Sequence, residues 1–156
     1  MRFENKVAIV TGSGMGLGKA YVNAFCKEGA KVIIAEYNEE TGKSCEKEMR
    51  EKGFEATFVK CDVSKEEDVI KAVDAAIEKY KKIDILVNNA QATDKSALPK
   101  MTEDTSDELF KLCWNTGAYA TFLFSKHVIP YMKKQSYGRI INTASATGVK
   151  GMATFS

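Results

Sequence analysis

A glycine-rich turn between a short apolar run and an amphipathic segment constrains this chain more than any other feature. The apolar run is Val7 to Val10, and residues 11–18 then follow as Thr-Gly-Ser-Gly-Met-Gly-Leu-Gly. Glycine lets backbone N–H groups approach an anion because no Cβ stands in the way, and the positive end of the next helix stabilises the same charge. The turn therefore predicts a phosphate-binding cradle and, with it, nucleotide binding.

Short runs rich in β-branched residues alternate with helical patterns along the whole chain. This alternation is typical of repeated βαβ units and a parallel sheet, whose strands are apolar because helices cover both faces. We predict an α/β fold with a doubly wound parallel sheet in a single domain over residues 1–156. The expected strands span residues 7–10, 31–35, 56–60, 83–87 and 139–143.

The helical pattern is clearest directly after the glycine turn. Apolar residues from Leu17 to Phe25 fall on one face, and Gly29 stands where a helix end favours a left-handed residue. Ser64 and Glu67 form a possible capping box for a helix that ends near Tyr80. The other expected helices span residues 39–52, 105–114 and 116–134. Thr105 and Glu108 are the expected caps of the second of these, and we expect the third to be buried. Residues 91–104 form the longest predicted loop.

Composition narrows the class of partner. The chain has 23 Lys and Arg against 21 Asp and Glu, a net charge of +2, and no dense basic run, so nucleic acid is not the expected partner. The four cysteines lie far apart and His127 is the only histidine, which disfavours a disulfide framework or a zinc site and leaves no expected metal. We expect reduced thiols in a cytoplasmic protein. No apolar stretch has signal-peptide or membrane-spanning length, so no membrane partner is expected either.

Glu36 narrows the expected ligand. It ends the second expected strand about 20 residues after the glycine turn, where a carboxylate can accept hydrogen bonds from both ribose hydroxyls of an adenosine. A carboxylate there repels a 2′-phosphate, and no Arg or Lys lies inside the turn or in the five residues after Glu36. NAD is therefore the expected cofactor, with NADP disfavoured. The alternative is that Glu36 is an ordinary solvated carboxylate at a strand end.

Four stretches, taken in order, resemble the short-chain dehydrogenase/reductase family. They are the Thr-Gly-x-x-x-Gly-x-Gly turn, Cys61-Asp62-Val63, Asn88-Asn89-Ala90 with Gln91 in place of the family's glycine, and residues 138–145, Gly-Arg-Ile-Ile-Asn-Thr-Ala-Ser. The resemblance extends from Lys6 to the last residue. It implies a Rossmann-like sheet with strand order 3-2-1-4-5 that lacks the family's last two strands.

The resemblance also implies roles for individual residues. The turn would hold the pyrophosphate through Gly12, Ser13, Gly14, Met15, Gly16, Leu17 and Gly18. Glu36 would bind the adenosine ribose, Asp62 and Val63 the adenine, and Asn89 with Ala90 the cofactor-side wall. Ser145 would hydrogen-bond the substrate oxygen, and Asn115 would help to hold a water of the proton relay. The implied partner is a small alcohol or ketone.

The family's proton donor is a tyrosine whose pKa is lowered by a lysine four residues later. Gly148 and Gly151 stand where the family has glycines between its serine and this tyrosine, and counting onward places the tyrosine just beyond Ser156. We therefore expect a truncated form or fragment with an unpaired sheet edge, marginally stable alone, and a homo-oligomer at full length.

Three functions stay open on these grounds. The favoured one is an NAD-dependent oxidoreductase that interconverts a secondary alcohol and a ketone, here as its cofactor-binding part. A hydroxysteroid is one possible substrate, because residues 89–92 and 119–122 look similar to some bacterial hydroxysteroid dehydrogenases. The alternatives are a non-catalytic dinucleotide-binding module or truncated paralogue, and a nucleotide-free domain for protein interaction.

Overall fold

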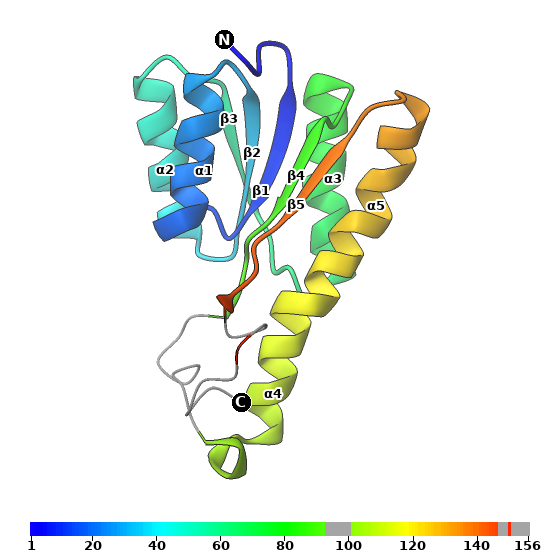
Figure 1. Ribbon diagram of the computed structural model, residues 1–156. Coiled ribbons are helices and arrows are strands. Elements are labelled where there is room, and N and C mark those ends of the chain that lie inside the picture. The colour runs from blue at the N-terminus through cyan, green and yellow to red at the C-terminus, as the bar shows by residue number, and fades with distance from the viewer. Residues whose placement is uncertain (93–100, 147–149, 151–156) are drawn as a thin grey trace.

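The computed structural model describes residues 1–92, 101–146 and 150, and its centre is one parallel sheet (Figure 1). The sheet has the order β3-β2-β1-β4-β5, as the resemblance implied. Its strands are β1 (Val7–Thr11), β2 (Lys31–Glu36), β3 (Ala56–Lys60), β4 (Ile85–Asn88) and β5 (Arg139–Asn142). The five predicted strands are confirmed, with ends that differ by at most two residues.

The central strands are buried on both faces, which explains their unbroken apolar sequences. In β1, Val7 and Ile9 belong to one core cluster, and Ala8 and Val10 belong to a second cluster across the sheet. Ile9 pairs with Ile33 of β2 on one side and with Leu86 of β4 on the other. Because no side chain of β1 faces water, both of its faces are apolar.

Helices cover both faces of this sheet. In Figure 1, α1 (Gly16–Lys27) and α2 (Glu39–Glu51) lie on one face, and α3 (Glu66–Tyr80) and α5 (Ala120–Lys134) lie on the other. The 3₁₀ turn Thr102–Asp104 and the helix α4 (Asp107–Trp114) lie beyond the sheet, past the carboxyl ends of the strands. A π-helical turn over Asn115–Tyr119 joins α4 to α5.

Two helix ends on the α1–α2 face are fixed by local chemistry. Gly29, with φ of 90°, follows the last residues of α1, and its N–H donates to the Cys26 carbonyl, as predicted. Asn38 caps α2, because its side chain accepts hydrogen bonds from the N–H groups of Glu40 and Thr41.

The predicted caps of the other two helices were wrong. Lys65, not Ser64, stands at the cap position of α3 and makes no side-chain cap, and the Ser64 hydroxyl donates to the Asp62 carboxylate at 2.6 Å. Ser106, not Thr105, caps α4 by accepting the Leu109 N–H, while the Thr105 hydroxyl donates to the Met101 carbonyl. In each case the helix begins one residue later than the pattern predicted.

The segment predicted as one buried helix over residues 116–134 is divided and only half buried. The π-helical turn interrupts it at its start, and α5 then keeps Leu123, Phe124 and Val128 in the core. Phe122 and Ile129 on its outer side are exposed at 57% and 37%. The segment therefore lies along one face of the sheet with its other side uncovered in the described structure.

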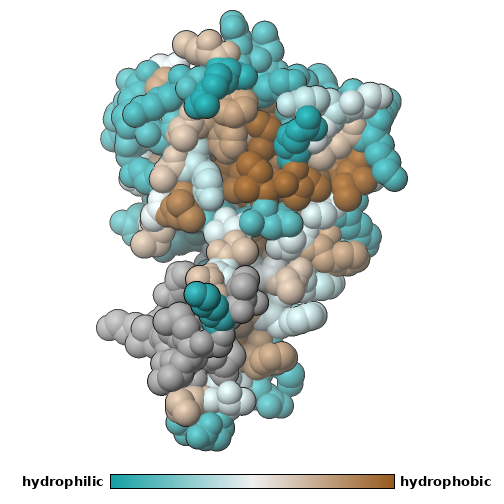
Figure 2. Space-filling model, viewed as in Figure 1, coloured by the Kyte–Doolittle hydropathy of each residue, from teal (hydrophilic) through white to brown (hydrophobic). Residues whose placement is uncertain are grey.

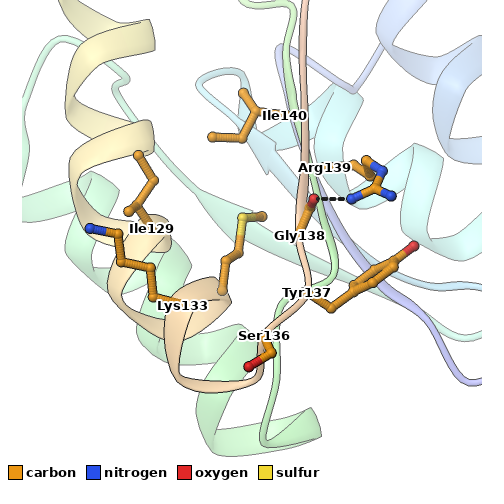
Figure 3. Close-up of a pocket in the computed structure, with 8 residues that line it drawn as sticks. Ile129, Lys133, Ser136, Tyr137, Gly138, Arg139 and Ile140 are labelled. Carbon is orange, nitrogen blue, oxygen red and sulfur yellow. Dashed lines mark hydrogen bonds between the residues drawn. The ribbon is translucent and has the colours of Figure 1, made fainter.

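The β5 edge of the molecule is apolar and exposed. All four residues of β5 are exposed, including Ile140 and Ile141. Figure 2 shows hydrophobic side chains gathered between β5 and α5 on this side of the molecule. A shallow depression of about 330 Å³ lies there, walled in part by Ile129, Met132 and Ile140 (Figure 3).

All four cysteines are free thiols. Cys26, Cys45 and Cys61 are buried, and burial raises the pKa of Cys26 and of Cys61 to about 12. These two thiols are therefore protonated and unreactive at neutral pH. Among the described residues, no helix is long and apolar enough to cross a membrane.

Candidate functional site

A pocket of about 530 Å³ opens at the carboxyl ends of the central strands. In a doubly wound sheet this edge is where ligands bind, because the strand order reverses there and neighbouring loops diverge. Six residues predicted as cofactor contacts line the pocket together: Gly12, Met15, Glu36, Asp62, Val63 and Ala90.

The glycine turn leaves no room for side chains at its closest approaches. Gly12 and Gly16 have left-handed φ angles of 59° and 52°. A Cβ on Gly12 would also lie 2.8 Å from the Ala90 Cα, and a Cβ on Gly18 would collide with the Gly12 carbonyl. The first turn of α1 is therefore packed directly against the strand end, which places the positive end of this helix at the pocket that Gly12 and Met15 line.

Thr11 and Asn89 hold this turn in place through hydrogen bonds. The Thr11 hydroxyl accepts hydrogen bonds from the N–H groups of Asn89 and Ala90, at 2.9 and 3.0 Å. The Asn89 side chain donates to the carbonyls of Thr11 and Gly12, both at 3.1 Å. The side chain of Asn89 thus joins the end of β4 to the glycine turn and does not line the pocket.

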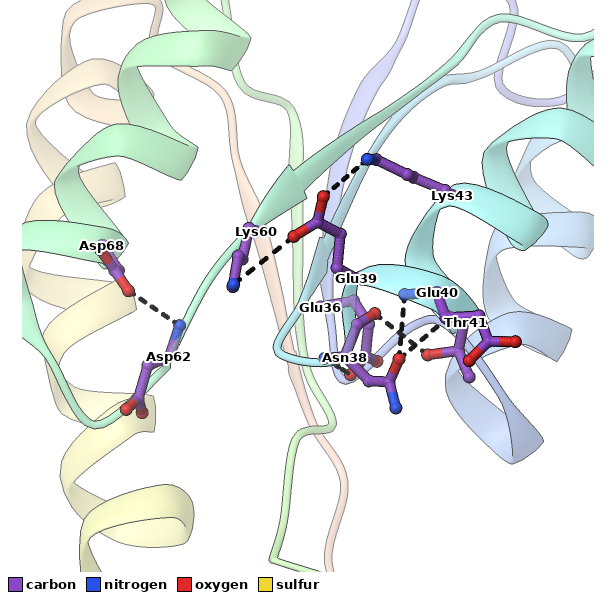
Figure 4. A network of polar contacts seen from close by, with 9 residues as sticks. All are labelled: Glu36, Asn38, Glu39, Glu40, Thr41, Lys43, Lys60, Asp62 and Asp68. Carbon is purple, nitrogen blue, oxygen red and sulfur yellow. Dashed lines mark hydrogen bonds and ion pairs between the residues drawn. The ribbon is translucent and has the colours of Figure 1, made fainter.

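Glu36 is held rigidly at the base of the turn. The residue is 9% exposed, and its carboxylate accepts hydrogen bonds from the N–H groups of Gly14 and Asn38, each at 2.9 Å. Figure 4 shows it beneath the start of α2. Gly14 fits because it has no side chain, since a Cβ would lie 2.9 Å from the Glu36 Cγ. The carboxylate is therefore fixed between the glycine turn and α2, facing the pocket that it lines.

The two lysines drawn in Figure 4 are both paired with Glu39. Lys43 and Lys60 contact its carboxylate at 2.6 and 3.5 Å (Figure 4). The Lys43 ammonium, more than Lys60, holds the pKa of Glu39 below its ordinary value. Among the described residues that line the pocket, none is Lys or Arg.

Asp62 lies in a well-ordered loop after β3. Its carboxylate accepts hydrogen bonds from the Ser64 N–H and hydroxyl, and its N–H donates to Asp68 (Figure 4). The Lys71 ammonium, at 2.9 Å, holds the pKa of the Asp68 carboxyl below its ordinary value. Asp68 is therefore an ionised acceptor that fixes this side of the pocket.

The wall opposite Glu36 combines the segment after β4 with the π-helical turn. It includes Gln91, Ala92, Leu112 and Thr116. The Thr116 hydroxyl accepts the Ala92 N–H at 3.1 Å and donates to the Leu112 carbonyl at 2.8 Å. The two segments are therefore joined directly across this end of the pocket.

The other predicted site residues are not among the residues that line the pocket. Ser13 is buried and donates to the Val10 carbonyl at 2.7 Å, while Leu17 is exposed on α1. Asn115 begins the π-helical turn and Ser145 follows β5, and both are exposed. Gly148 and Gly151 lie outside the described residues.

Eight pocket residues were not predicted. Those on the loops after β2 and β3 could have been found, because any residue directly after a parallel strand faces this edge. Leu112 and Thr116 could not, since only the fold brings α4 and the π-helical turn to this place. The eight are Tyr37, Asn38, Cys61, Ser64, Gln91, Ala92, Leu112 and Thr116.

In the part of the chain that the structure describes, no group of three or more His, Cys, Asp or Glu side chains could hold a metal ion.

The sheet order and the two helical layers define a doubly wound α/β protein of the Rossmann type. Residues 6–156 match the family model for short chain dehydrogenases, and the chain belongs to this family of oxidoreductases. An uncharacterised oxidoreductase of Bacillus subtilis is 38% identical over 150 residues, which cover 96% of this chain and 57% of that protein. L-fucose dehydrogenase of Bos taurus is 34% identical, over 97% of this chain and 53% of that protein.

Solved structures give the same result. A 7α-hydroxysteroid dehydrogenase in complex with NADH and 7-oxoglycochenodeoxycholic acid has a TM-score of 0.90 and 30% identity, over 98% of this chain and 58% of that one. NAD⁺-bound xylitol dehydrogenase has a TM-score of 0.92 and 35% identity, over 99% and 58%. The chain thus spans 53 to 58% of the length of these four proteins.

Proposed function

We propose that this chain is the NAD-binding part of an oxidoreductase that interconverts a secondary alcohol and a ketone. The observation that carries the proposal is the pocket beside the glycine turn, with the fixed carboxylate of Glu36 in its wall and no cation among its described lining residues. The glycine turn fits a pyrophosphate because Gly12 and Gly18 let the turn and the first residues of α1 pack closely on the strand ends, which places the positive end of α1 at the pocket.

Different residues around the pocket would bind different parts of the dinucleotide. The N–H groups at the start of α1 would hold the pyrophosphate, because those of Gly12 and Gly14 already donate to the Ala35 carbonyl and the Glu36 carboxylate. Glu36 would accept the two adenosine ribose hydroxyls through lone pairs that the Gly14 and Asn38 N–H groups leave free. Asp62 and Val63 would contact the adenine, and Ala90, braced by Asn89, would form the wall beside the nicotinamide half.

Electrostatics favours NAD over NADP at this site. A 2′-phosphate would lie next to the Glu36 carboxylate, with Lys43 and Lys60 already paired with Glu39. At an effective dielectric constant of about 20, two like unit charges about 4 Å apart repel by about 4 kcal/mol, roughly a thousandfold in affinity. This repulsion is large enough to decide the cofactor.

Bound NAD supplies a hydride acceptor, and NADH supplies the hydride for the reverse reaction. The chain's own residues would position the substrate oxygen, with the Ser145 hydroxyl as its hydrogen-bond partner. Asn115 would help to hold the water through which the proton leaves. Both residues stand at positions that the family resemblance assigned to these roles.

For the substrate, we propose a hydroxysteroid as the first candidate and a sugar alcohol as the second. The structural similarity to a 7α-hydroxysteroid dehydrogenase supports the first, and the similarity to xylitol dehydrogenase and L-fucose dehydrogenase supports the second. We also propose a cytoplasmic, homo-oligomeric protein, since all four thiols are free and exposed aromatic residues such as Trp114 and Phe122 are available for subunit contact.

Titration of the folded chain with NADH and NADPH, followed by cofactor fluorescence, tests the proposal. We expect NADH to bind at least about 100-fold more tightly than NADPH. E36Q should reduce this preference by at least about tenfold, because the substitution removes the charge that repels the phosphate. E40Q is the matched control, since Glu40 is an exposed acidic residue of α2 that does not line the pocket. A folded chain that binds neither cofactor at millimolar concentration would contradict the proposal and favour the nucleotide-free alternative.

A further inference from the structure

Gln91, an exposed residue, and Gly117 lie next to each other at the end of the pocket opposite Glu36. A Cβ built on Gly117 would lie 2.9 Å from Gln91 Oε1, 3.7 Å from Cδ and 3.8 Å from Nε2, and these are its three nearest neighbours outside the local backbone. The side-chain amide of Gln91 therefore rests on the backbone of the π-helical turn. Any side chain at position 117 would displace it.

A hydrogen bond lies beside this contact and joins the same two segments. The Thr116 hydroxyl accepts the Ala92 N–H at 3.1 Å. Gln91, Ala92 and Thr116 all line the pocket. Two adjacent residues of the segment after β4 are thus held by two adjacent residues of the π-helical turn, and the pocket wall is formed where they meet.

We infer that Gln91 is a positioning residue that acts through Gly117 and sets the width of this end of the pocket. Because Glu36 and Asp62 lie at the adenosine end, this opposite end takes the nicotinamide half of the dinucleotide. The inference rests on the proposed function. Gln91 occupies a position where the family motif has glycine, so this wall contains a side chain that the motif itself does not supply.

The positioning role of Gln91 depends on the length of its side chain and on the absence of a side chain at position 117. Q91G removes the contact, and we expect faster hydrogen exchange at the Ala92 amide, by about tenfold, because its bond to Thr116 loses support. Q91M keeps the reach and the volume without the amide, and we expect parent-like exchange. NADH affinity should fall about fivefold in Q91G and stay within about twofold of the parent in Q91M.

A double-mutant cycle with G117A separates a specific contact from general destabilisation. In the parent chain, G117A forces the Gln91 amide aside, and we expect the same loss of NADH affinity as in Q91G. In the Q91G background the added methyl group meets no side chain, so G117A should cause no further loss. Additive losses would overturn the inference.

The other possible results also decide whether Gln91 has a positioning role. Unchanged Ala92 exchange in Q91G would overturn the positioning role whether or not NADH binds. Weakened NADH binding in Q91M with unchanged exchange would overturn it in favour of direct contact between the amide and the ligand. If the parent chain binds no NADH, the proposed function fails, and the exchange rates of Q91G and Q91M still decide the Gln91 contact.

Discussion

At the scale of single residues, the glycine turn uses the missing side chain for two different reasons. Gly16 has a left-handed φ of 52°, but a Cβ there would meet no atom within 4 Å. Gly18 lies in the ordinary helical region, yet a Cβ there would collide with the Gly12 carbonyl. Glycine is required at position 16 by the backbone conformation and at position 18 by close packing.

The variants G16A and G18A should therefore differ in their effects. G16A adopts a left-handed conformation at a cost of about 1–2 kcal/mol in the free energy of unfolding, with space for the methyl group. G18A must move the first turn of α1 away from the strand end, at about 1–3 kcal/mol, and should also abolish measurable NADH binding. Thermal unfolding and NADH titration of both variants test this. Parent-like NADH affinity in G18A would contradict it.

The sequence predicted the glycine turn and Glu36 because both depend on residue type at a fixed distance along the chain. It did not predict that Asn89 supports the turn from beneath. That role needs the carbonyls of Thr11 and Gly12 within reach of a side chain 77 or 78 residues away. Only the pairing of β1 with β4 brings them together.

At the scale of elements, ion pairs connect helices that the sequence shows only as separate patterns. Glu48 of α2 contacts Lys19 of α1 at 2.6 Å and Lys52 at 2.6 Å. Hydrogen bonds from Lys19 and then Lys52 lower the pKa of Glu48 to about 2. This carboxylate joins α1 and α2, the two helices that lie on the same face of the sheet.

We expect E48Q to lower the melting temperature at pH 7, and this difference to depend on pH. A carboxyl group whose pKa is lowered in the folded state stabilises the fold above its unfolded value, here near 4.5. The difference between E48Q and the parent should therefore shrink as the pH falls from about 4.5 to about 2. E51Q is the control, since the ion pair of Glu51 among the described residues is with Lys47 of the same helix, at 3.8 Å. An E48Q difference that stays constant over this range would contradict the assignment.

The predicted strands and the first helix were correct in position, but finer details were not. The helix after the glycine turn ends at Gly29 as predicted, yet α1 buries Gly18, Val22, Phe25 and Cys26, whereas Leu17 of the predicted apolar face is 54% exposed. The capping box at Ser64 failed because α3 begins one residue later than the pattern predicted, which places Lys65 at the cap position. The π-helical turn over Asn115–Tyr119 was not predicted, because it depends on how backbone hydrogen bonds pair, which apolar spacing does not show.

At the scale of the whole molecule, β5 forms an exposed, apolar edge of the sheet. β5 pairs with β4 on one side only in the described structure, and its residues are exposed along their full length. Ile140 lies near Ile129 of α5 around the depression in Figure 3. Exposed apolar strand edges promote association between molecules.

We expect this chain to self-associate in a concentration-dependent way through that edge. I140K places a charge on the edge strand and should shift the chain toward the monomer, as measured by size-exclusion chromatography with light scattering. A lysine substitution at Ile70 is the matched control, because Ile70 is similarly exposed, at 38%, but lies on α3. A parent chain that stays a dispersed monomer at high concentration would contradict the expectation.

The sequence by itself determined the α/β fold, and it predicted the turn proposed to bind phosphate and the acidic residue proposed to favour NAD, because these depend on local spacing and residue type. The tertiary structure alone decided that Asn89 braces the turn, that α4 and the π-helical turn close the pocket, and that Gln91 rests on Gly117. These contacts join residues 24 to 78 positions apart. Distances of that kind are set by how strands pair and helices pack, which no local pattern encodes.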